Sequence, residues 1–314
     1  PRSTLSSSSA ASDVYKRQEI TGLRGLIGNL NWATREGMPQ GTGEASILAS
    51  TLSTPKVKDL REANAAFRRL LATADTPVPI RPIPLDRLVL FTFTDSSLAN
   101  AGGGLSQICY MVCAAGCSIR DGANADISCL TFKSHKNKKA GSATLLVEAN
   151  GMSEGLAETE WVASWIGIAK DISYELRKRH LLNREIKVTT VMREPECLKS
   201  VLAVTDAKSM YDNLNREQYT GAEKRAALEI CVIRDSLESL DGVCRWVPHD
   251  QNPVDCMSKL KGNTSRMLQL FRDRKYRLVA EEVEMEERRE YREATGSRNP
   301  RPKRPVSYTH LRAH

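Results

Sequence analysis

The stretch Leu88–Val112, LVLFTFTDSSLANAGGGLSQICYMV, contains two apolar runs separated by a short polar segment. The first run, Leu88–Thr94, is rich in β-branched and aromatic residues and ends at Asp95, and the second run begins at Leu105. Runs of this composition favour β-strands. The three glycines at 102–104 are not followed by the spacing of a phosphate-binding loop, so they indicate a flexible hairpin. The stretch therefore predicts two strands, with an acidic residue where the first one ends.

The alternation of strand and helix continues after this hairpin. Ile127–Lys133 follows the turn signal RDGANAD, Leu198–Thr205 ends at Asp206, and Val243–Val247 is a fifth β-rich run. Helical spacing occupies 144–179 and about 222–240, and residues 253–261 are expected to start a closing helix. The order predicts an α/β fold with a mixed five-stranded sheet flanked by helices. Apolar residues available for a buried face of the first helix are Leu145, Met152, Leu156, Trp161 and Trp165.

The segments on either side of this core differ from it in composition. Residues 1–18 are serine-rich without periodicity, and 306–314 are unrelated to their surroundings, so both resemble translated adaptor sequence. Residues 19–84 are expected to be a small helical segment that ends in a proline-rich linker. Residues 85–262 hold the predicted sheet. A charged helical extension is expected at 263–297 and a basic, disordered tail at 298–314.

The composition favours a protein that binds a polyanion. The formal net charge is +8, and aromatic residues make up only 5% of the chain, which argues against a surface of stacked bases. No apolar run is long enough to span a bilayer and no secretory signal is recognised, so an intracellular location, cytoplasmic or nuclear, is expected. Cys109, Cys113 and Cys117 are expected to be buried thiols, because their spacing is not that of zinc ligands.

Four acidic residues stand at predicted strand ends or helix starts. Asp95 and Asp206 end strands, Glu148 lies early in the long helix, and Asp255 begins the closing helix. Taken singly, each is better explained as a capping or turn residue. Because strand ends and helix starts meet along one edge of an α/β sheet, we expect the four to converge, with the two aspartates on neighbouring strands. Crowded carboxylates repel one another unless cations neutralise them, and such hard ligands select Mg²⁺ or Mn²⁺.

Four segments resemble the RNase H domain of copia-type retrotransposon polyproteins. FTFTDSSLANAGGGLSQICYMV at 91–112 and VLAVTDAKSMYDNL at 201–214 match strands that end in Asp. GSATLLVEANGMSEGLAETEWVASW at 141–165 stands where the family has Ser-Ser-Thr-Glu-Ala-Glu-Tyr and an alanine-rich helix. WVPHDQNPVDCMSKL at 246–260 matches the last motif. Upstream, LRGLIGNLNWATREGMPQ at 23–40 resembles the helical tail of the family's reverse transcriptase.

The resemblance implies a ribonuclease H that cuts the RNA strand of an RNA–DNA hybrid endonucleolytically. Two Mg²⁺ or Mn²⁺ ions would be held by Asp95, Glu148, Asp206 and Asp255. The first acid and the Tyr of the family motif are missing from SATLLVEAN, so Glu154 stays an alternative to Glu148. The resemblance also implies an RNase H-like sheet and, as a partner, the polymerase domain of the same polyprotein. The paired catalytic aspartates of that polymerase are absent from this chain.

Two further features bear on how a nucleic acid is handled. His249 lies in the loop before Asp255, where related hydrolases keep a mobile histidine that helps the product leave, and it titrates near neutral pH. The segment KSHKNKK offers possible phosphate contacts, with a solvated loop as the alternative: Lys133, Lys136, Lys138 and Lys139. Two rival functions remain. One is a decayed transposon fragment that only binds nucleic acid, and the other is an integrase-type transferase, against which WVPHDQNPVD argues.

Overall fold

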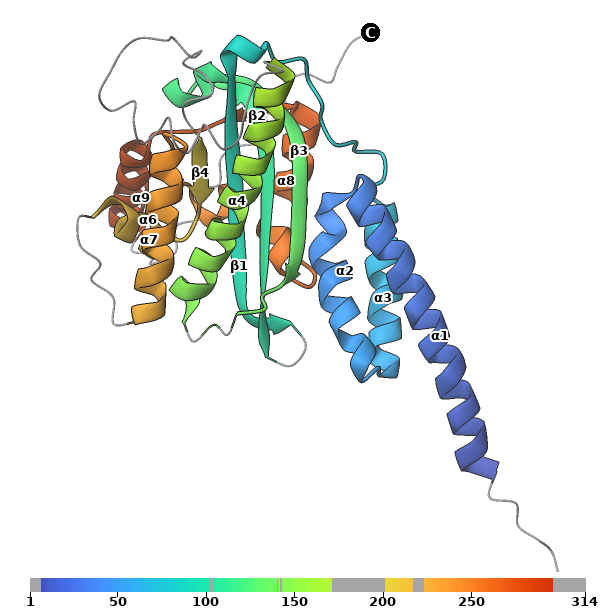
Figure 1. Cartoon of the computed structure of the whole chain (residues 1–314). Helices are drawn as coiled ribbons and strands as arrows, with labels where there is room; N and C mark the ends of the chain where they lie inside the picture. Colours follow the sequence, from blue (N-terminus) through green and yellow to red (C-terminus); the bar gives the residue numbers. More distant parts are fainter. Residues whose placement is uncertain are drawn as a thin grey trace, which may run out of the picture. The chain divides into compact units, whose positions relative to one another are not determined.

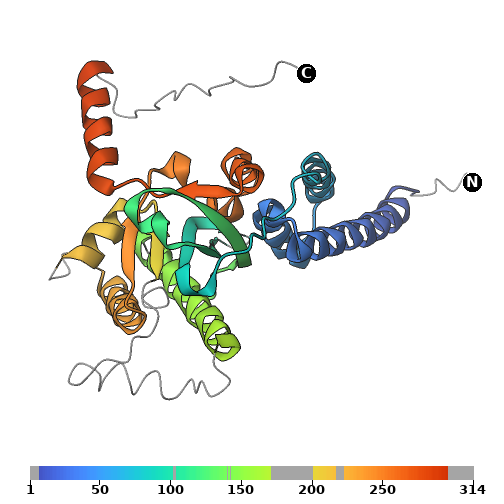
Figure 2. The ribbon, with the colours of Figure 1, turned by 90° about the horizontal axis from the view of Figure 1, so that it is seen from above.

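The computed structural model describes residues 7–101, 104–139, 141, 143–170, 201–216 and 223–295. The chain divides into two compact units, Pro1–Leu278 and Val279–His314. The first unit holds the sheet and the helices around it (Figure 1, Figure 2). The predicted helix end at 171–179 and the strand approach at 198–200 lie outside the described residues.

A mixed sheet with the order β5-β4-β1-β2-β3-β6 lies at the centre of the first unit. Neighbouring strands are antiparallel from β1 through β2 and β3 to β6, whereas β4 and β5 continue the sheet from β1 with parallel pairing. The strands are β1 (Leu88–Ala101), β2 (Leu105–Gly116), β3 (Asn124–Lys136), β4 (Leu202–Thr205), β5 (Val243–Trp246) and β6 (Lys275–Arg277). The expected mixed sheet flanked by helices is therefore confirmed.

Helices cover both faces of this sheet because residues of β1 alternate between two cores. Leu88 and Leu90 face a core shared with α4, α6 and α7, while Phe91 and Phe93 face a core shared with α8. Figure 2 shows helices on both sides of the sheet. These helices are α4 (Thr144–Lys170), α6 (Lys208–Asn215), α7 (Lys224–Ser239) and α8 (Ser265–Asp273). The cysteines predicted to be buried belong to the core shared with α8 or pack against it. Cys109 and Cys113 are fully buried, and Cys117 is partly exposed.

Three helices before the sheet form a small core of their own. They are α1 (Ser7–Glu36), α2 (Thr42–Ala49) and α3 (Val57–Leu71). α1 begins at Ser7, inside the serine-rich stretch 1–18, whose composition differs from that of the rest of the chain. Its apolar residues recur at helical spacing and pack on those of α3: Leu23, Ile27 and Leu30 with Ala63, Ala66 and Leu70. α2 contacts β3, so this helical segment is joined to the edge of the sheet (Figure 1).

Short 3₁₀ turns connect several of these elements. They are Pro39–Gly41, Ser50–Ser53, Leu85–Arg87, Cys117–Asp121, His249–Gln251 and Asp255–Ser258. The last of these corrects the closing helix predicted at 253–261. The residues around Asp255 make a single tight turn, and the next α-helix, α8, begins at Ser265. Hydrogen bonds to the sheet fix this turn: Ser258 Oγ donates to Asp95 of β1, and the Met257 carbonyl accepts from Ser134 Oγ of β3.

The sheet has one strand more than the five that the sequence predicts. β6 is only three residues long, too short for an alternating pattern to be visible in the sequence. It is held by Tyr276, which is 2% exposed. The ring of Tyr276 lies edge-on to Phe93 at 5.0 Å and stacks on Phe91 at 6.2 Å between centroids. Aromatic packing therefore adds this strand at the edge of β3.

The buried face of α4 also differs from the predicted one. Met152 and Leu156 are buried as expected, but Trp161 and Trp165 are 55% and 56% exposed. The face toward the sheet runs instead through small residues, since a Cβ at Gly155 would already lie 2.9 Å from threonine methyl groups of β1. Small side chains let α4 approach the sheet closely, and the bulky tryptophans are left on another face.

The second unit contains one described helix, α9 (Glu281–Thr295). Arg289 and Glu293 form an i,i+4 ion pair at 3.0 Å on it, as its charge pattern predicts. The division of the chain into the segments proposed from the sequence stays a prediction. Among the described residues, none of the helices has the length and apolar character needed to cross a membrane.

Candidate metal centre

Two aspartates lie where the parallel pairing of β1 and β4 stops. The last parallel pair joins Phe93 to Val204, and Asp206 directly follows the end of β4. β1 continues to Ala101, so Asp95 lies inside this strand and not at its end as predicted. The two strands are neighbours, as the sequence analysis expected, and both aspartates therefore lie just beyond the same register position.

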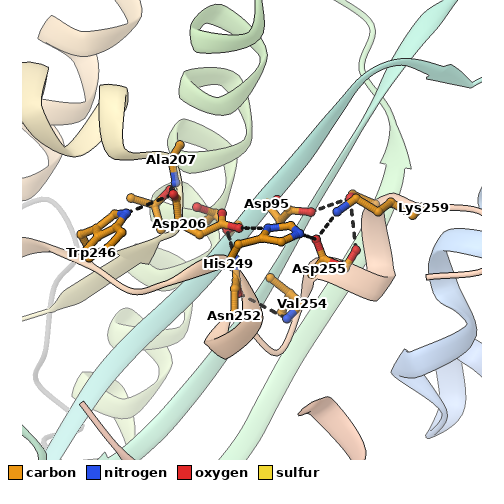
Figure 3. Close-up of polar contacts among 12 residues, drawn as sticks. Asp95, Asp206, Ala207, Trp246, His249, Asn252, Val254, Asp255 and Lys259 are labelled. Carbon is orange, nitrogen blue, oxygen red and sulfur yellow. Dashed lines mark hydrogen bonds and ion pairs between the residues drawn. The ribbon is translucent and has the colours of Figure 1, made fainter. Parts of the chain in front are cut away.

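A histidine bridges Asp206 and Asp255 (Figure 3). His249 Nδ1 lies 2.5 Å from Asp206 Oδ2, and His249 Nε2 lies 3.1 Å from Asp255 Oδ1. The three residues offer ligand atoms that all lie within 4.8 Å of one another, which is close enough to share one cation. The hydrogen bond with Asp206 raises the pKa of His249, with the charge of Asp255 also contributing and partial burial opposing. The charged imidazole is thus the form that this bridge favours.

The turn after the histidine orients the carboxylates of Asp95 and Asp255. Ser258 Oγ donates a hydrogen bond to Asp95 Oδ2 at 2.5 Å. Lys259 Nζ forms an ion pair with Asp255 Oδ1 (Figure 3). Partial burial lowers the pKa of Lys259, but the hydrogen bond to Asp255 and the charge of Asp95 outweigh it, and the net effect is a raised pKa. Lys259 therefore stays charged beside the acidic residues.

Asn252 joins this turn to both strands. Its Nδ2 donates to the Thr94 carbonyl at 3.0 Å and to Asp206 Oδ1 at 3.2 Å. Trp246 Nε1 donates to the main-chain carbonyl of Asp206 at 3.1 Å. Asp206 is thereby held through both its side chain and its main chain, and its orientation relative to β1 is fixed.

Glu148 reaches the same group of acids from α4. Its side chain is buried, and its Oε2 has no hydrogen-bonding partner among the described residues. Burial, together with the negative charge of Asp206, raises the pKa of Glu148 to about 8. Burial and the charges of Asp206 and Glu148 likewise raise the pKa of Asp95. An unpartnered buried oxygen among crowded carboxylates is a position that a cation would fill.

Glu154, the alternative to Glu148, contacts a different part of the sheet. Its Oε2 lies 2.8 Å from His135 Nε2 on β3. This hydrogen bond lowers the pKa of Glu154, opposite to the effect at Glu148. Of the two candidates on α4, the structure brings Glu148 to the aspartates and places Glu154 against β3.

The four candidate phosphate-binding lysines do not share one surface. Lys133 and Lys136 are three positions apart on β3, so their side chains leave opposite faces of the sheet. Lys138 is exposed just after the strand ends, and Lys139 Nζ lies 2.6 Å from Glu229 Oε1 of α7. Contact of any of these lysines with nucleic acid stays a prediction, and Lys139 already has an anionic partner.

Three polar residues of the site were not among the sequence candidates: Ser258, Asn252 and Lys259. All three lie in the motif at 246–260. Their closeness to Asp255 in the sequence was the only signal that could have found them. Ser258, for example, follows Asp255 by three residues and so shares one 3₁₀ turn with it. Nothing in the sequence indicates that Ser258 would bond Asp95, which lies 163 residues earlier.

Comparison with known proteins yields only remote structural similarity. No family model and no curated protein matches the chain. RNase H1 from the halophilic archaeon Halobacterium salinarum shares 10% identity at a TM-score of 0.32, over 52% of this chain and 88% of that chain. The N-terminal RNase H domain of Rv2228c from Mycobacterium tuberculosis, fused to maltose-binding protein, shares 10% at 0.31, over 52% and 86%.

A foamy viral protease–reverse transcriptase in complex with an RNA/DNA hybrid shares 11% identity at a TM-score of 0.28, over 54% of this chain and 19% of that chain. Similarity at these scores is too weak to carry a functional assignment. A functional assignment therefore depends on the topology of the sheet and the geometry of the carboxylates.

Proposed function

We propose that the chain is a divalent-metal-dependent nuclease of the RNase H type, which hydrolyses the RNA strand of an RNA–DNA hybrid. Two observations support this most, and the four acids involved come from distant parts of the sequence. Asp206 and Asp255 hold His249 between them, within reach of one cation. The charges of these two aspartates add to burial in raising the pKa of Asp95 and of Glu148. Burying several like charges together is unfavourable unless something neutralises them. A stable fold needs no such cluster, whereas a site for divalent cations does.

The donor set fits Mg²⁺ or Mn²⁺. All four candidate ligands are carboxylates, which hard cations prefer. Glu148 would offer its unpartnered Oε2, and Asp206 and Asp255 would exchange the imidazole between them for a metal ion. Two such ions, when bound, activate a water for attack on a phosphodiester and stabilise the departing oxygen.

Other side chains of the chain orient these acids and handle protons. Ser258 holds Asp95, and Asn252 holds Asp206, so the carboxylates are oriented before any substrate arrives. The side chain of His249 is 64% exposed, which leaves it accessible to solvent. An exposed imidazole beside the acids suits proton delivery to the departing 3′ oxygen near neutral pH. Lys259 adds positive charge where a phosphate would enter.

The choice of substrate and the polyprotein context come from the resemblance to copia-type RNase H domains. Hybrid selectivity would depend on helix shape and on 2′-hydroxyl contacts, without reading of bases. In this proposal α1–α3 are the end of the preceding reverse transcriptase, and the polymerase domain of the same polyprotein is the partner. The products would carry 5′ phosphate and 3′ hydroxyl groups.

Cleavage of a hybrid with a labelled RNA strand tests the proposal. We expect cleavage in Mg²⁺, no cleavage in EDTA, and no cleavage by Asp206→Asn, which keeps the shape of a ligand but removes its charge. Asp212→Asn is the matched control, because Asp212 pairs with Lys208 on α6. A wild-type chain that binds the hybrid but leaves it intact in Mg²⁺ would instead support the decayed fragment that only binds nucleic acid.

A further inference from the structure

The loop that follows Asp255 has a strained backbone. Lys261 has a φ of +60°, in the left-handed region that residues other than glycine rarely adopt. Gly262 comes next, and a Cβ there would lie 2.5 Å from the Cα of Cys256, so the loop folds back tightly on the turn. A conformation of this kind persists only when its surroundings fix it. Something outside the loop must therefore hold it.

A buried carboxylate of α2 provides this support. Glu44 is 8% exposed, and its Oε1 accepts a hydrogen bond from the Lys261 main-chain N–H at 3.0 Å. Arg69 of α3 holds the same carboxylate, with Nε at 3.0 Å and Nη2 at 2.7 Å from Oε1. The charge-assisted pair with Arg69 holds the Glu44 carboxylate in place. That carboxylate in turn holds the main chain at Lys261, six residues after Asp255.

α2 also lies directly against the turn itself. A Cβ at Gly43 would lie 2.5 Å from the carbonyl oxygen of Met257, so the two backbones are in close contact. The same carbonyl accepts a hydrogen bond from Ser134 Oγ of β3 at 2.5 Å. The next residue, Ser258, donates to Asp95. Contacts therefore run without a gap from α2 through the turn to the acidic cluster.

We propose that Glu44 is a positioning residue for the metal centre, so that α1–α3, whatever their origin in the polyprotein, are a working part of the nuclease. The inference rests on the proposed function, since it takes the acidic cluster to bind divalent cations. Glu44 acts through the loop: if the loop shifts, Asp255 and the bond from Ser258 to Asp95 shift with it. Removing Glu44 should then weaken cation binding while every ligand is still present.

Calorimetric titration of the purified full-length chain with Mn²⁺ tests the proposal on Glu44→Ala. Loss of a group that orients a metal ligand weakens metal binding by about 10- to 100-fold, and we expect the Kd for Mn²⁺ to rise by that factor. Excess Mn²⁺ should restore the cleavage rate. Glu62→Ala is the matched control, because Glu62 pairs with the side chains of Arg69 and Lys261 at 2.7 Å each, while Glu44 bonds the loop main chain.

Amide hydrogen exchange gives a second measurement that does not depend on cleavage, and its wild-type part does not depend on the folding of a variant. The Lys261 amide should exchange slowly in the wild type although the residue is exposed, and faster in Glu44→Ala than in Glu62→Ala. An unchanged Mn²⁺ affinity in Glu44→Ala, an equal loss in Glu62→Ala, or an unprotected wild-type Lys261 amide would each overturn the proposal.

The two proposals can fail separately. A wild-type chain that binds Mn²⁺ but leaves the hybrid intact defeats the nuclease and leaves the role of Glu44 standing. A wild-type chain that binds no Mn²⁺ overturns the role of Glu44 together with the metal centre.

Discussion

Glu148→Gln should stabilise the metal-free protein, and increasingly so as the pH rises. Burial and the charge of Asp206 raise the pKa of Glu148 from 4.5 to about 8. Between these two pH values the native state keeps a proton that the unfolded chain releases, so the free energy of unfolding of the wild type falls as the pH rises. At 1.36 kcal/mol per pH unit the loss reaches roughly 5 kcal/mol by pH 8. The glutamine variant carries no such charge.

Urea unfolding in EDTA at pH 5 and at pH 8.5 measures this effect. The variant should gain up to about 5 kcal/mol over the wild type between the two pH values. Glu154→Gln, on the same helix, is the control, because its hydrogen bond with His135 lowers the pKa of Glu154 from 4.5. Glu154 is therefore ionised in the folded and the unfolded chain at both pH values, and the effect of this variant on stability should be the same at pH 5 and at pH 8.5. Equal stabilisation by Glu148→Gln at both pH values would refute the burial of Glu148 among like charges.

Three other changes should have measurable effects. The pKa of His249 is raised, so its bridge to the aspartates forms at low pH and is lost as the pH rises through that pKa. The Mg²⁺ affinity of the wild type should therefore increase above about pH 6.5. His249→Ala should flatten this pH dependence in a calorimetric titration. Alanine at Lys133 or Lys136 should reduce the slope of log binding constant against log salt concentration for the hybrid, by roughly 0.7–0.9 for each phosphate that the side chain neutralises. Alanine at Lys139 should leave this slope unchanged, because Lys139 is already paired with Glu229. Gly155→Ala should cost about 1–3 kcal/mol of stability, seen as a lower urea midpoint, because its Cβ would meet threonine methyl groups at 2.9 Å; an unchanged midpoint would show that α4 can move.

Strands β1 to β5, and the placement of Asp95 and Asp206 on neighbouring strands, were predictable because their signal is local. Asp95 and Asp206 follow apolar runs of strand-forming residues, and the order of elements places those runs side by side. The choice between Glu148 and Glu154 was not predictable, because it depends on which face of α4 lies on the sheet. That face is set by small residues such as Gly155, whereas the sequence draws attention to large apolar ones.

The supports of the site were beyond sequence reasoning for a different reason. They are ordinary polar residues whose partners lie far away along the chain. Ser258 bonds an aspartate 163 residues earlier, and Glu44 bonds a main-chain amide 217 residues later. No spacing rule links such pairs. β6 escaped prediction because three residues are too few to show a pattern, and only the packing of Tyr276 reveals why it forms.

Crystals grown with Mn²⁺ would test the metal centre most directly, through the anomalous scattering of the bound ions. Two peaks are predicted, about 3.5–4 Å apart, among the carboxylates of Asp95, Glu148, Asp206 and Asp255. The imidazole of His249 should have left its place between the two aspartates. A cluster without any anomalous peak at saturating Mn²⁺, with His249 still bridging Asp206 and Asp255, would contradict the account.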